Sequence, residues 1–108
     1  MSIFADASLL RIFIGESDQF DNKPLYEAIV EKARAVQLNG ATVLRGQMGY
    51  GRSTIRHAGT SFWVTQDYPV IVEIVDTMEN LEAFICQSKK MTENCIMTLE
   101  KVNVLQKD

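Results

Sequence analysis

The sequence predicts an α+β domain whose elements follow in the order β-α-β-β-α-β. Two observations carry this prediction. Four segments have the apolar patterns of strands, and two others repeat apolar residues at helical spacing. The order is the ferredoxin-like arrangement, in which two helices cover one face of a four-stranded antiparallel sheet. We expect one such domain over residues 1–108, because a chain of this length forms a single core.

The first third of the chain supplies a strand and a helix. Alternation over residues 8–15 predicts a strand with one fully apolar face. Pro24 suits the first turn of a helix, and apolar residues then recur at helical spacing as far as Leu38. The pair Asn39-Gly40 is expected to end this helix, because glycine tolerates the left-handed conformation of a C-terminal cap.

The remaining elements are three strands and a second helix. Residues 41–48 predict a weak strand, and residues 70–76 a central strand buried on both faces. The second helix is expected to run to about Lys90 behind an acidic capping box formed by Asp76 and Glu79. Residues 95–105 predict the last strand.

Two helices cover only one face of this sheet, so the other face would carry exposed apolar residues. Leu9, Ile71 and Val75 fall on that second face by their alternation. A contiguous apolar surface of this kind is typical of an interface between copies. We therefore expect an oligomer that buries it.

The long connection between the second and third strands has the composition of an anion-binding loop. Residues 45–59 contain four glycines and three arginines, and no Asp or Glu occurs from Lys32 to Gln66, although the formal net charge of the chain is -3. Glycines let backbone N–H groups approach a ligand, and arginine offers a fork of donors suited to phosphate or carboxylate. A glycine-rich hairpin tip with solvated arginines is the alternative interpretation.

Composition excludes several other classes. The acidic balance argues against nucleic acid as a partner, which would require many phosphate contacts. No apolar run approaches the roughly 20 residues of a membrane helix, and the first residues lack the pattern of a signal peptide, so a cytoplasmic protein that is not membrane-inserted is expected. Cys86 and Cys95 are expected to be buried free thiols.

Two motifs resemble PII-like proteins of the PII/CutA-related superfamily. These are Gly40-Ala41-Thr42 and Gly49-Tyr50-Gly51-Arg52, followed by QDYPVIVEIVD at residues 66–76. The resemblance extends from Leu10 to Val104 and is strongest to the uncharacterised family called domain of unknown function 190. It implies a homotrimer with a nucleotide in each cleft between subunits. Residues 49–67 would form a T-loop-like segment.

The resemblance also nominates site residues. Gly51 and Arg52 match the phosphate-binding root of the T-loop, and Thr42 matches a threonine near the adenine. The wider set of anion-binding candidates adds Gly49, Arg45 and Arg56 from the same cationic stretch.

Two departures from the PII pattern argue against the sensing of ATP, magnesium and 2-oxoglutarate that is typical of PII proteins. Residues 88–95 contain no glycine where PII proteins have a Gly-Lys loop, so Lys89 and Lys90 are the candidates for that charge. Ser53 stands where PII proteins have a glutamine.

Three function classes follow. The leading hypothesis is a trimeric sensor that binds an adenine nucleotide or another anionic metabolite. It would present its loop to a partner protein, for which a membrane transporter or channel is a candidate. The second is a structural or interaction subunit that does not bind nucleotide. An enzyme is the third, but His57, the single histidine, has no orienting partner in the sequence. We expect neither catalysis nor a metal site.

Overall fold

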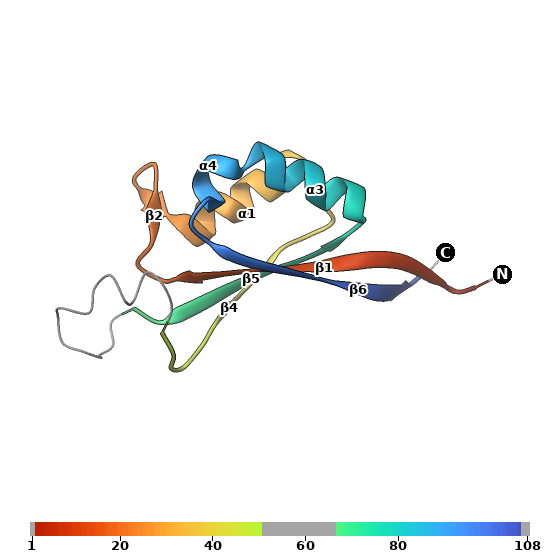
Figure 1. Cartoon of the computed structure of the whole chain (residues 1–108), viewed down its shortest axis with the longest axis horizontal. Coiled ribbons are helices and arrows are strands. Elements are labelled where there is room, and N and C mark those ends of the chain that lie inside the picture. Colours follow the sequence, from red (N-terminus) through yellow and green to blue (C-terminus); the bar gives the residue numbers. More distant parts are fainter. Residues whose placement is uncertain (1, 51–66, 107–108) are drawn as a thin grey trace.

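Four antiparallel strands form the central sheet in the order β4-β5-β1-β6 (Figure 1). In the computed structural model, which describes residues 2–50 and 67–106, β1 spans Phe4–Gly15, β4 Thr42–Arg45, β5 Pro69–Asp76 and β6 Ile96–Leu105. The helices are α1 (Leu25–Ala35), α3 (Met78–Gln87) and the single turn α4 (Lys89–Thr92). A small hairpin of β2 (Gln19–Phe20) and β3 (Lys23–Pro24) precedes α1. The ferredoxin-like β-α-β-β-α-β order is confirmed.

The three helices of the described residues lie on one face of the sheet, and that face holds the core (Figure 1). Alternate residues of β1 and β5 meet the apolar stripes of α1 and α3, as the period-two pattern requires. The most deeply buried side chains, each 1% exposed or less, are Leu10, Ile12, Ile29, Val72, Ile74, Leu81 and Phe84.

Helix α1 ends earlier than the sequence indicates, and its cap is not a glycine. Gln37 takes the left-handed conformation, with φ of 64°. Its N–H donates to the carbonyl of Arg34, and the N–H of Leu38 donates to that of Ala33, both at 3.0 Å. These two bonds form a Schellman motif. The predicted cap at Asn39-Gly40 was therefore wrong, because backbone hydrogen bonding closes the helix at Gln37.

The cap of α3 is displaced by one residue from the predicted acidic box. Thr77 is the N-cap, and its hydroxyl accepts from the N–H of Asn80 at 3.1 Å. The helix ends at Gln87, and the hydroxyl of buried Ser88 donates to the carbonyl of Phe84 at 2.8 Å. Lys89 and Lys90 therefore begin the separate turn α4 instead of ending one continuous helix.

Three burial and length predictions are also corrected. Within the single chain, β5 is buried on one face only, since Val75 on its other face is 38% exposed. The second strand is shorter than residues 41–48 and is confined to Thr42–Arg45. Cys86 is exposed and Cys95 is half-buried, because Cys86 lies off the apolar stripe of α3 formed by Leu81 and Phe84.

Candidate functional site

An open depression of about 640 Å³ lies where β4 begins and β5 ends. Thr42, the residue matched to an adenine-proximal threonine, lines it together with Glu73 of β5. The small side chains of Ala5 and Ala7 on β1 leave the space open, and Val104 of β6 closes its far side. The volume falls within the range of small-molecule sites. Its lining combines apolar and polar residues.

Asp76 organises the rim of this depression. Its buried carboxylate accepts hydrogen bonds from the N–H of Asn39 at 2.9 Å, the N–H of Thr77 at 2.7 Å and the side-chain amide of Asn80 at 2.8 Å. Burial opposes the charged form, but the hydrogen bonds from Asn80, Asn39 and Thr77 together outweigh it and lower the pKa of Asp76. One carboxylate thus fixes the turn before β4 against the start of α3.

The structure separates Thr42 from Arg45, although both belong to the predicted site. Thr42 pairs with Glu73 of β5, whereas Arg45 pairs with Val70, and residues three apart in a strand face opposite sides of the sheet. Thr42 therefore lies on the face away from the helices, and Arg45 lies on the helix-covered side. A single ligand in the depression would contact Thr42 without Arg45 in the same chain.

Arg45 instead belongs to a small clamp at the start of the connection. Its amino nitrogen lies 3.1 Å from Glu16, and its guanidinium stacks on the ring of Tyr68 at 4.5 Å from the centroid. The N–H of Glu16 donates to the carbonyl of Tyr68 at 2.8 Å. Residues 32–66 contain no Asp or Glu, but the fold places the carboxylate of Glu16 beside Arg45.

Gly46 and Gly49 fit closely against Pro69, the first residue of β5. The N–H of Gly46 donates to the carbonyl of Pro69 at 2.7 Å. A Cβ atom at Gly46 would lie 2.8 Å from Pro69 Cγ, and one at Gly49 would lie 3.2 Å from it. At least these two glycines are explained by close packing of the loop root.

The other predicted site residues divide into two groups. Lys89 and Lys90 are exposed on α4, on the helix side of the sheet. Gly51, Arg52, Arg56 and the histidine considered for catalysis, His57, lie outside the described residues.

Among residues 2–50 and 67–106, no group of His, Cys, Asp and Glu side chains is arranged to hold a metal ion. In that same part of the chain, no helix is long and apolar enough to cross a membrane.

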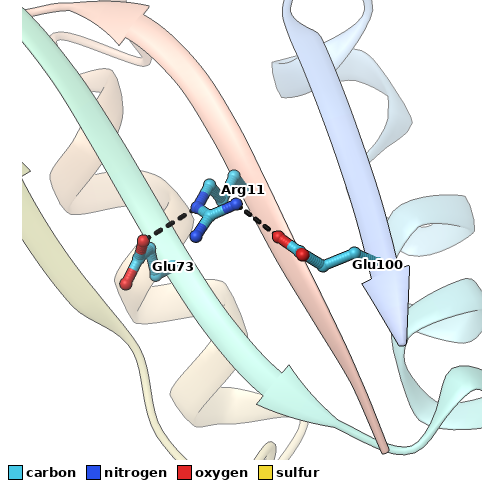
Figure 2. Close-up of polar contacts among 3 residues, drawn as sticks. All are labelled: Arg11, Glu73 and Glu100. Atoms are coloured by element: carbon cyan, nitrogen blue, oxygen red, sulfur yellow. Dashed lines mark hydrogen bonds and ion pairs between the residues drawn. The ribbon is translucent and has the colours of Figure 1, made fainter. Parts of the chain in front are cut away.

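A charged cluster on the open face of the sheet was missed by the sequence reasoning. Arg11 of β1 lies between Glu73 of β5 and Glu100 of β6 (Figure 2). Alternation alone places Arg11 and Glu73 on the non-core faces of their strands, so that signal was available. The pairing of the strands, which brings Glu73 and Glu100 to either side of Arg11, was not.

Solved structures of PII-like proteins share this fold. CPII from Thiomonas intermedia K12 is described as a nitrogen regulatory PII-like protein bound to ADP, AMP and bicarbonate. It matches with a TM-score of 0.61 at 11% identity, over 97% of this chain and 99% of that one. A protein from Thermus thermophilus, described as PII-like and signaling, matches with a TM-score of 0.63 at 16% identity, over 96% and 94%. The fold is therefore that of the PII-like class.

The sequence places the chain more narrowly. The model of the DUF190 family, described as uncharacterized ACR, matches residues 7–104, and the chain belongs to this family. A UPF0166 protein of Aquifex aeolicus is 38% identical over 97 residues, which cover 90% of this chain and 91% of that protein. A UPF0166 protein of Methanocaldococcus jannaschii is 30% identical over 88 residues, covering 82% and 81%.

Proposed function

We propose that the protein is a cytoplasmic PII-like signalling protein that acts as a homotrimer. It binds an adenine nucleotide, or another anionic metabolite, in the clefts between subunits. It then signals through residues 49–67 to a partner protein, for which a membrane transporter or channel is a candidate. In this proposal the protein is not an enzyme, because its output is a change in which partner it binds.

The depression beside Thr42 is the observation that carries this proposal. Among the residues that the structure describes, its lining includes Asp6, Glu73 and Asp76 but no lysine or arginine, so this part of the wall suits a neutral base and ribose better than a phosphate. The phosphates of a nucleotide would need cations from elsewhere. Arg52 of a neighbouring copy is our candidate, because the loop-root arginine Arg45 of the same chain lies across the sheet. The CPII structure described with ADP and AMP is consistent with this ligand class.

The clamp at the loop root suggests how binding would be transmitted. Arg45 and Gly46 hold the chain before residue 51, and Tyr68 and Pro69 hold it after residue 66. Ligand contacts at Gly49–Arg52 would act on a segment whose two ends are fixed. A nucleotide that prefers one conformation of this segment would shift its population toward that conformation.

Calorimetric titration with ATP, ADP, AMP and cyclic AMP tests the proposal. We expect saturable binding of at least one nucleotide, weakened roughly tenfold or more by Arg52→Ala because a charge-assisted phosphate contact is lost. Thr42→Val should weaken binding by a smaller factor. Its matched control is Thr42→Ser, which keeps the hydroxyl in the depression and should bind nearly as the wild type does. Absence of heat with all four nucleotides would rule out a nucleotide sensor.

A second candidate function is a structural or interaction subunit that binds no nucleotide. The specific observation in its favour is that residues 89–92 form the helical turn α4, where PII proteins have a glycine-rich loop. Limited proteolysis of the loop with and without each nucleotide separates the two candidates. A nucleotide sensor should show a changed cleavage rate, and an interaction subunit should not.

A further inference from the structure

The face of the sheet away from the helices carries large apolar side chains around a charged centre. On β1 and β5 these positions alternate with core residues, and the strand register places their partners on β4 and β6 on the same face. Their exposed fractions range from 38% to 48% for Phe13, Leu44, Val75, Ile96 and Val104. A folded chain in water would not leave such a surface uncovered without a cost in free energy.

The charged centre leaves hydrogen-bonding capacity unused. Nε of Arg11 lies 3.0 Å from Oε2 of Glu73, and Nη1 of Arg11 donates to Oε1 of Glu100 (Figure 2). Within the described residues, no further protein hydrogen bond is made by Nη2 of Arg11, Oε1 of Glu73 or Oε2 of Glu100. Each copy of the face therefore presents a cationic amino group, Nη2 of Arg11, and carboxylate oxygens that are not paired within the chain.

These unpaired groups of Arg11, Glu73 and Glu100 determine which kind of partner the open face would bind most favourably. A purely apolar partner would remove the cluster from water without pairing it, which is costly for charged groups. A partner of one charge sign would satisfy either the guanidinium or the carboxylates. A second copy of the same face brings both signs beside the same apolar residues, so it can satisfy both.

We propose that the Arg11–Glu73–Glu100 cluster makes this face selective for further copies of the same chain, with Nη2 of Arg11 in one copy donating to Glu73 or Glu100 of its neighbour. This inference rests on the self-association in the proposed function and deepens it by naming the residues that select the partner. Because the cluster carries two carboxylates for one guanidinium, copies packed out of register would bring like charges together. Register is thus fixed by charge, and the surrounding apolar residues supply the attraction.

Rescue in trans tests the proposal with the full chain. Arg11→Glu leaves three carboxylates in the cluster and should weaken assembly by roughly 30-fold or more, as loss of a buried interfacial charge pair does. Glu100→Arg alone leaves an excess of positive charge and should also weaken it. Mixing the two variants should restore mixed oligomers, detected by native mass spectrometry and sedimentation velocity. Lys23→Glu is the matched control, since it breaks the exposed Lys23–Glu31 pair, and it should assemble as the wild type does.

Each outcome has one meaning. A monomeric wild type at all accessible concentrations would overturn self-association itself, and this inference with it. If the wild type is oligomeric and Arg11→Glu assembles equally tightly, the inference is overturned but self-association stands. The same holds if the two variants fold but form no mixed oligomers. Circular dichroism verifies folding. If Arg11→Glu does not fold, Arg11→Met serves as the second variant, and an unchanged dissociation constant for it would overturn the inference.

Discussion

The two faces of the sheet are made by the same strands but are completed by different partners. Leu10 and Ile12 of β1 are fully buried under the helices, whereas Arg11 and Phe13 of the same strand point to the open face. The helix-covered face forms the core of the chain with α1 and α3. The open face pairs its charges internally but leaves its apolar groups exposed. The comparison teaches that one strand can contribute to the core with one set of alternate residues and keep the other set accessible for the self-association proposed above.

The sharpest test of this difference replaces one phenylalanine on each face. Phe84→Ala should lower the free energy of unfolding by about 3–5 kcal/mol, because a side chain 1% exposed leaves a cavity in the core. Phe13→Ala should cost no more than about 1 kcal/mol in a dissociated chain, since its ring is already 38% exposed.

Urea denaturation at two protein concentrations measures both effects. Under the proposed self-association, the Phe13→Ala effect should grow with protein concentration, because assembly would stabilise the wild type more than a variant that lacks this side chain of the interface. The Phe84→Ala effect should remain large at both. Equal losses for the two variants in dissociated chains would show that the faces do not differ in this way.

The carboxylate of Asp76 joins the covered face to the rim of the depression, and its removal should have the next largest effect. Asp76→Asn should cost about 1–3 kcal/mol, because the amide keeps only one acceptor oxygen. Its NH2 group would face either the N–H of Asn39 or the donors of Thr77 and Asn80, which the carboxylate satisfies. The folded pKa of Asp76 is lowered. Its contribution is therefore complete above the unfolded pKa of about 3.9 and is lost as pH falls through the folded pKa.

Urea denaturation between neutral pH and pH 3 reads out this contribution. The wild type should lose more stability on acidification than Asp76→Asn does. Glu79→Gln, an exposed carboxylate change in the first turn of α3, is the control and should follow the wild type. Parallel pH profiles for wild type and Asp76→Asn would contradict the role assigned to Asp76.

A smaller effect is expected at the loop root. Gly46→Ala should destabilise the fold by about 1–2 kcal/mol, because the added Cβ would meet Pro69 Cγ at 2.8 Å. Pro69→Ala removes that Cγ, so the double variant should recover part of the loss. A double-mutant cycle from thermal denaturation measures the coupling. Strict additivity would show that Gly46 is not constrained by Pro69.

The smallest expected effect is the change in ADP affinity on Arg45→Ala, which tests whether the two faces of β4 differ in ligand binding. Arg45→Ala should change the affinity for ADP by less than about threefold, because Arg45 faces away from Thr42 and its pair with Glu16 is solvent-exposed. Calorimetry beside Arg52→Ala provides the comparison. A tenfold loss with Arg45→Ala would place Arg45 in the anion site, as its position in the sequence suggested.

Local pattern was enough to predict the order of the elements and the core face of β1, because period-two and helical spacings survive in the folded chain. It failed where distant residues meet. Glu16 reaches Arg45 across 29 positions, so the absence of nearby acids in sequence was misleading. The cap at Gln37 depends on backbone hydrogen bonds that override the preference for glycine.

The candidate site was predictable only in part. The resemblance to PII-like proteins led to Thr42, which lines the depression, but not to Asp76, which holds its rim through a pairing with Asn39. The roles proposed for Gly51, Arg52 and Arg56 remain predictions, because these residues lie outside the described ranges.

The pairing of β1 with β6 has a consequence for how the chain could be rewired. Phe4 lies opposite Leu105, the N–H of Gln106 donates to the carbonyl of Ile3 at 2.7 Å, and both ends leave the sheet side by side (Figure 1). A short linker between those ends would close the backbone into a ring without altering the strand order. β6 and β1 would then be consecutive strands of one hairpin. Cutting the circular backbone at a different connection would give a circular permutant with the same strand order.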